Sequence, residues 1–94
     1  MNTVRRIRVI VRGEVQGVGY RAFARRCAAR LGLNGWVRNR PDGNVDLEVE
    51  GPPATVGDML DLARQGPSFA TVDGVDILED VTSEAPEHRD FSIR

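Results

Sequence analysis

The sequence contains no lysine, so all of its strongly basic side chains are arginines. Its single cysteine, Cys27, excludes an internal disulfide framework and favours a reducing compartment. Aromatic residues make up only 5% of the chain, and no apolar run has the length of a signal peptide or a membrane span. These absences predict a cytoplasmic protein, with Cys27 as an inert thiol on the apolar face of a helix.

The rest of the composition is that of one folded domain covering residues 1–94, but its charge is unevenly distributed. The first forty residues hold ten of the thirteen arginines and one acid, a formal charge of +9. The remaining residues hold three arginines and thirteen acids, a formal charge of −10, so the net charge of −1 hides two opposed halves. We therefore expect a positive field around any site in the first half.

Hydrophobic periodicity predicts the order strand, helix, strand, strand, helix, strand, followed by a short last strand. The expected strands are residues 4–12, 34–39, 45–50, 70–79 and 91–94, and the expected helices are residues 20–31 and 53–65. Residues 80–90 are expected to form an acidic connection. This order is typical of the ferredoxin-like α+β fold. In that fold both helices cross to the same face of one antiparallel sheet, which gives a two-layer sandwich.

The segment between the first strand and the first helix, residues 13–21, is suited to hold an anion. Its three glycines allow tight turns and converging backbone N–H groups, and the helix start adds free donors. Arg21 falls in the first helical turn, where a cation costs roughly 0.3–1 kcal/mol unless an anion lies between it and the N–H groups. We interpret the segment as a phosphate site. The plainer alternative is a sharp connection followed by a solvated arginine.

Asn39 ends the strand that enters the turn at residues 40–43, which is expected to be of type I. Asparagine is common beside turns, where it forms local hydrogen bonds, and this explanation suffices for Asn39 taken alone. Its neutral amide could also hold a water molecule through one donor and one acceptor.

Two segments resemble the signatures of the acylphosphatase family. Residues 13–21, Gly-Glu-Val-Gln-Gly-Val-Gly-Tyr-Arg, closely resemble the first signature, and residues 35–45, Gly-Trp-Val-Arg-Asn-Arg-Pro-Asp-Gly-Asn-Val, resemble the second. The resemblance continues to residues 91–93 and covers nearly the whole chain. It implies a ferredoxin-like fold and hydrolysis of the carboxyl-phosphate anhydride bond of small acyl phosphates to carboxylate and inorganic phosphate.

The same resemblance implies roles for particular residues. Arg21 would bind the phosphate, Asn39 would position the attacking water, and the phosphate would also meet the backbone N–H groups of Val15, Gln16, Gly17, Val18, Gly19 and Tyr20. It implies no catalytic carboxylate, no metal and no cofactor. The expected partner is a small acyl phosphate, with no specific nucleic acid and no membrane, and we expect a monomer.

The other polar residues have plain explanations. Asp46, Glu48 and Glu50 alternate along one strand and are expected on its solvated face. His88, the only histidine, is expected at the surface of the acidic connection. Trp36 is expected to be half-buried beside the second signature.

Two alternatives to an enzyme remain at this point. Ferredoxin-like sheets often bind RNA by stacking bases on aromatic side chains of the central strands, although these strands carry no exposed aromatic pair. A regulatory domain that kept the fold and lost catalysis is the second alternative, because fold alone does not establish activity. The presence of both Arg21 and Asn39 favours the enzyme.

Overall fold

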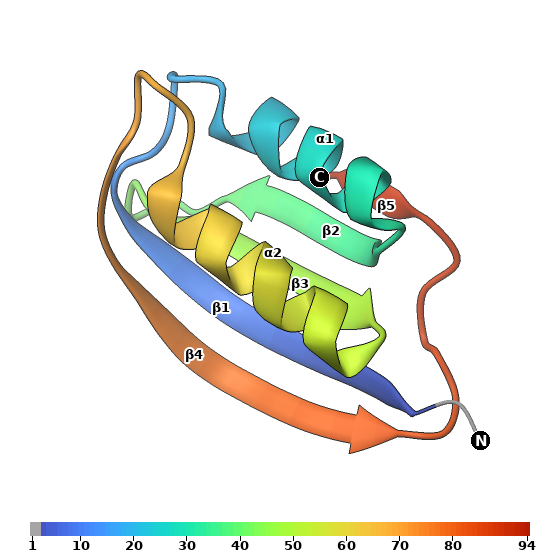
Figure 1. Ribbon diagram of the computed structural model, residues 1–94. Coiled ribbons are helices and arrows are strands. Elements are labelled where there is room, and N and C mark those ends of the chain that lie inside the picture. The colour runs from blue at the N-terminus through green and yellow to red at the C-terminus, as the bar shows by residue number, and fades with distance from the viewer. Residues whose placement is uncertain (1–2) are drawn as a thin grey trace.

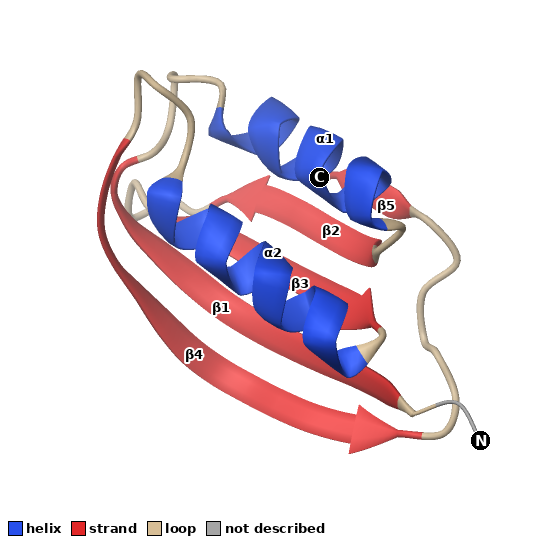
Figure 2. Cartoon of the chain, viewed as in Figure 1, coloured by secondary structure: helices blue, strands red, loops and turns tan. Residues whose placement is uncertain are grey.

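The computed structural model of the chain describes residues 3–94 and consists of two helices on one five-stranded sheet (Figure 1). The elements follow one another as β1 (Val4–Glu14), α1 (Tyr20–Leu31), β2 (Asn34–Asn39), β3 (Val45–Gly51), α2 (Pro53–Gln65), β4 (Thr71–Ser83) and β5 (Phe91–Ile93). Both helices cover the same face of the sheet (Figure 2). The predicted ferredoxin-like two-layer α+β sandwich is therefore confirmed.

The sheet has the strand order β4-β1-β3-β2-β5, and it is mixed rather than wholly antiparallel. β1 pairs antiparallel with β3 and β4, and β2 pairs antiparallel with β3, whereas β5 runs parallel to β2. The reason is the path of residues 84–90. β4 ends at the end of the sheet where β2 begins, so a chain that crosses there continues beside β2 in the same direction.

The expected boundaries hold for both helices but not for β4. β4 continues to Ser83, four residues beyond the predicted end, and Asp80 is paired with Ile7 of β1. The acids that suggested a loop are instead held against β1 by arginines: Arg5 donates two hydrogen bonds to Asp80, at 2.9 and 2.8 Å. The acidic connection is therefore restricted to residues 84–90.

The core lies between the helices and the sheet. Tyr20 is buried there, and its hydroxyl donates a 2.8 Å hydrogen bond to the Ala63 carbonyl, while burial raises its pKa above the ordinary value. Cys27 packs against the same core with its pKa raised by burial, as expected for an inert thiol. Within residues 3–94, neither helix has the length and apolarity needed to cross a membrane. The fully buried aliphatic residues of the sheet are Ile7, Val9, Val11, Val37, Val45, Leu47 and Val49.

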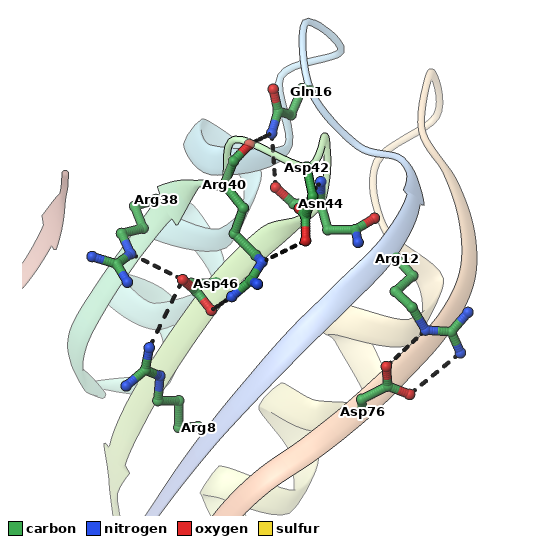
Figure 3. Close-up of polar contacts among 9 residues, drawn as sticks. All are labelled: Arg8, Arg12, Gln16, Arg38, Arg40, Asp42, Asn44, Asp46 and Asp76. Atoms are coloured by element: carbon green, nitrogen blue, oxygen red, sulfur yellow. Dashed lines mark hydrogen bonds and ion pairs between the residues drawn. The ribbon is translucent and has the colours of Figure 1, made fainter.

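The face of the sheet turned away from the helices, here called the outer face, is not the solvated surface that its acids suggest. Asp46 is fully buried, with Arg38 at 2.9 Å, Arg40 at 3.1 Å and Arg8 at 3.9 Å from its carboxylate oxygens (Figure 3). Arginine stems cover the surface around the carboxylate while their charged ends remain partly in water. The expectation of a solvated Asp46 is wrong for this reason.

Trp36 is also covered on the outer face, and is buried rather than half-buried. The guanidinium carbons of Arg8, Arg38 and Arg94 lie 5.3, 5.2 and 4.8 Å from its ring centroid. These distances suit cation–π attraction. The ring is therefore not a free platform for a nucleobase.

The connection between β4 and β5 is tied to β3 by two glutamates that were expected in solvent. Glu50 is buried and accepts hydrogen bonds from the backbone N–H groups of Glu87 and His88. The ring of His88 lies 2.5 Å from the Glu48 carboxylate, so His88 is a partly buried anchor rather than a plain surface residue.

Candidate active site

The loop between β1 and α1 takes its shape from two glycines in left-handed conformations. Gly17 has φ +74° and Gly19, which precedes the first turn of α1, has φ +81°. Residues with a side chain rarely adopt such φ angles, so glycine is needed at both positions. Gly13 serves strand pairing instead, because a Cβ atom there would lie 2.0 Å from the Thr71 carbonyl oxygen of β4.

The backbone N–H groups of this loop are free to meet a ligand. From residue 15 to residue 22, none of them donates to a backbone carbonyl in the described part of the chain. The last three belong to the first turn of α1, where N–H groups have no partner within the helix. A helix start with free donors attracts anions, because the helix dipole places partial positive charge there.

Arg21 lies at this helix start and is half-buried. Among residues 3–94 it forms no ion pair, although most arginines of the chain do. Its guanidinium therefore remains available for the oxygens of an anion, to which it can donate two parallel hydrogen bonds.

Gln16 fastens the loop to the hairpin between β2 and β3. Its side-chain amide donates to the carbonyl oxygens of Arg40 at 2.7 Å and Asn44 at 2.8 Å (Figure 3). The hairpin turn is itself braced by Asp42, whose pKa is lowered by the backbone N–H of Asn44 and by Arg40. Sequence reasoning gave Gln16 only a backbone role and missed this link, because the two segments are 24 residues apart.

Asn39 is the last residue of β2, directly before this turn. Its side-chain oxygen is buried and has no hydrogen-bond partner within residues 3–94. Buried polar atoms in native proteins almost always have a partner from protein or water. Asn39 therefore has unused hydrogen-bonding capacity at the end of β2.

One pocket of about 240 Å³ brings the two segments together. Arg21 and Asn39, which come from different elements, both line it. Gln16 and Val18, which were predicted to contribute only backbone N–H groups, are absent from the lining: the Gln16 side chain reaches the hairpin and Val18 packs against the core. Ala22 and Ile93 were missed, and for Ile93 the only signal was its place beyond Phe91 in a short last strand. The pocket is lined by Val15, Gly17, Gly19, Tyr20, Arg21, Ala22, Asn39 and Ile93.

Comparisons with known proteins identify the family of the chain. A family model described as acylphosphatase matches residues 7–93. The acylphosphatase of Methylococcus capsulatus is 51% identical over 85 residues, covering 89% of this chain and 92% of that protein. The acylphosphatase of Salinibacter ruber is 41% identical over 92 residues, covering 98% of this chain and 95% of that protein. The crystal structure of acylphosphatase from Bacillus subtilis is similar with a TM-score of 0.86 at 36% identity, covering 96% of this chain and 98% of that one. The chain belongs to the acylphosphatase family, and it is a hydrolase of acyl phosphates.

Proposed function

We propose that the enzyme holds the phosphate of its substrate between Arg21 and the backbone N–H groups of residues 15–20, while Asn39 positions the attacking water. The observation that carries this proposal is the shared pocket, which is lined by Arg21, by Asn39 and by the glycine loop. It joins an anion-binding element to a water-binding amide.

The phosphate is the part of the substrate that needs the protein's charge. Phosphoryl transfer depends mainly on positioning and on stabilising the charge of the transferred oxygens. The Arg21 guanidinium and the free N–H groups of the loop supply that charge together. The loop is fastened to the hairpin by Gln16 before the substrate arrives, so its N–H groups need little reorganisation at the moment of reaction.

The water is held opposite this charge by Asn39. Asn39 lines the pocket, and a side-chain amide can both donate a hydrogen bond to a water and accept one from it. Because a neutral amide is a weak base, its contribution is orientation of the water rather than removal of its proton.

The leaving group explains why no further catalytic residue is required. The carboxylate released from an acyl phosphate is stable in water, so the bond breaks without a strong general acid. We therefore propose that the reaction proceeds without a metal ion or cofactor. We also propose that the enzyme is a monomer. Excess EDTA is expected to leave the rate unchanged, and a loss of activity would contradict this part of the proposal.

Hydrolysis of benzoyl phosphate by matched variants tests the assignment. Arg21→Ala is expected to lower kcat/KM about 10²–10³-fold and to weaken inhibition by inorganic phosphate. Asn39→Ala is expected to lower kcat with a smaller effect on phosphate inhibition. Arg30→Ala, which removes an exposed arginine in the last turn of α1, at the other end of the helix from Arg21, serves as the control. Near-normal hydrolysis by Arg21→Ala would refute the proposed role.

A further inference from the structure

Ile93 is a large aliphatic residue that is exposed at the mouth of the pocket. Successive side chains of a strand alternate between faces, so Phe91 and Ile93 share the face that the helices cover. Phe91 packs against the core, whereas Ile93 remains 38% exposed and lines the pocket. The other large exposed hydrophobic residues, Phe69, Ile77, Leu78 and Val81, are absent from the pocket lining.

The pocket has room for more than a phosphate group. A water molecule occupies about 30 Å³ in the liquid, so about 240 Å³ corresponds to roughly eight waters, whereas a phosphate has five heavy atoms. The polar side chains of the lining are Arg21, Asn39 and Tyr20, and the Tyr20 hydroxyl is turned away toward Ala63. Beyond the phosphate-binding groups, the remaining wall is therefore apolar.

The strand that carries Ile93 is held firmly beside β2. The backbone N–H of Arg94 donates to the Val37 carbonyl at 2.8 Å, and that of Gly35 donates to the Asp90 carbonyl at 2.8 Å. These two hydrogen bonds lie on either side of β5, and Ile93 is paired with Val37, two residues before Asn39. The Ile93 side chain is thus placed close to the proposed water site by a fixed backbone.

We infer that Ile93, together with Ala22 on α1, forms the acyl subsite of the enzyme and favours substrates with a bulky apolar acyl group, such as an aryl or branched aliphatic group. This inference rests on the proposed function, because it assigns to the acyl group the part of the pocket that the phosphate does not use. A bulky apolar group buries surface against Ile93, whereas an acetyl group scarcely reaches it. The subsite is apolar and open on one side, so it favours an acyl group by the apolar surface that the group buries and does not exclude larger groups by size.

The test is Ile93→Ala, assayed with benzoyl phosphate and with acetyl phosphate. We expect kcat/KM for benzoyl phosphate to fall about tenfold, mainly through KM, and that for acetyl phosphate to fall by less than about twofold. The inhibition constant of inorganic phosphate is expected to stay the same. Ile93→Leu should keep the preference for benzoyl phosphate. Leu78→Ala, which removes an exposed side chain of β4 that is absent from the pocket lining, is the matched control.

Each other outcome has a distinct meaning. If Ile93→Ala leaves the ratio of the two substrates unchanged, whether both rates fall together or neither falls, the acyl subsite is refuted while the proposed function stands. If the Leu78→Ala control changes the ratio equally, the effect is not specific to the pocket and the inference also fails. If the unaltered enzyme hydrolyses neither acyl phosphate, the proposed function itself fails and the subsite with it.

Discussion

The arginines of the sheet and the arginines of α1 are in opposite electrostatic surroundings. Six arginines of the β-strands and the hairpin turn lie within 4.0 Å of a carboxylate, namely Arg5, Arg6, Arg8, Arg12, Arg38 and Arg40. Four arginines of α1 have no ion pair in the described part of the chain, namely Arg21, Arg25, Arg26 and Arg30. Arginines therefore neutralise carboxylates on the sheet, whereas the arginines of α1 keep their charge unpaired.

Because of this difference, the positive field that the sequence predicts for the first forty residues is confined to a smaller part of the molecule. Antiparallel pairing of β1 with β4 and β3 brings the acids of the second half beside the arginines of the first, as for Arg12 and Asp76 (Figure 3). The unbalanced positive charge is then concentrated on α1, whose first turn lines the pocket. The fold thus places Arg21, which has no ion pair among residues 3–94, beside the site where an anion is expected.

The largest effect on the contrast between the sheet arginines and the α1 arginines is expected for Asp46→Asn, which removes the buried carboxylate of the outer face. Three arginines lie within 4.0 Å of it. We expect the free energy of unfolding in urea to fall by about 2–4 kcal/mol, because charge-assisted hydrogen bonds are lost around a buried group. Asp73→Asn is the control, since Asp73 is exposed and has no ion pair within residues 3–94. A loss equal to that of the control would show that the outer face contributes little.

A smaller loss in the free energy of unfolding is expected for Glu50→Gln, which loosens the connection between β4 and β5. The Glu50 carboxylate accepts hydrogen bonds from the backbone N–H groups of Glu87 and His88, and the side-chain amide of glutamine would turn an N–H donor toward one of them. We expect a loss of about 1–2 kcal/mol, and faster hydrogen exchange at the amides of Glu87 and His88. Glu84→Gln, at an exposed position in the same connection, is the control. Unchanged exchange at both amides would contradict an anchoring role.

These two variants concern the part of the fold that sequence reasoning described least well. Hydrophobic periodicity was enough to predict the strand β1 and the helix α1 with its end at residue 31. The burial of Asp46 depends on arginines from β1 and β2, which only the folded sheet brings together. The local sequence pattern shows that one face of β3 carries acids, but it does not show which side chains bury them.

The site shows the same division between local and long-range information. Arg21 and Asn39 belong to continuous signatures, so their candidacy was visible in the sequence, and the shared pocket now brings them together. The contacts of Gln16 with the hairpin and the place of Ile93 beside β2 are long-range. No spacing in the sequence encodes them, because β5 joins the sheet by crossing from its opposite edge.

A weaker and pH-dependent effect is expected for Asp80→Asn at the edge of the sheet. Two hydrogen bonds from Arg5 lower the pKa of Asp80 below its ordinary 3.8. Its stabilising contribution is therefore complete above about pH 4 and is lost as the pH falls through the lowered folded-state pKa. We expect a loss of about 0.5–1 kcal/mol at neutral pH, since the pair is partly exposed, and a difference from the unaltered protein that shrinks as the pH falls below 3.8. Urea unfolding across this range measures it, and a constant difference would contradict the pairing.

The smallest effect is expected for Arg26→Gln, which tests the α1 side of the comparison. Arg26 and Arg30 are exposed and lie four residues apart on α1, where two like charges destabilise by roughly 0.2–0.5 kcal/mol, and glutamine has a similar helix propensity to arginine. The free energy of unfolding should therefore stay the same or rise by up to about 0.5 kcal/mol at low salt, and any gain should fade at high salt as charges are screened. Arg5→Gln is the matched control, and it is expected to lose stability because it gives up its contact with Asp80. Equal losses in the two variants would mean that α1 arginines have carboxylate partners in solution, and the contrast between the two layers would be wrong.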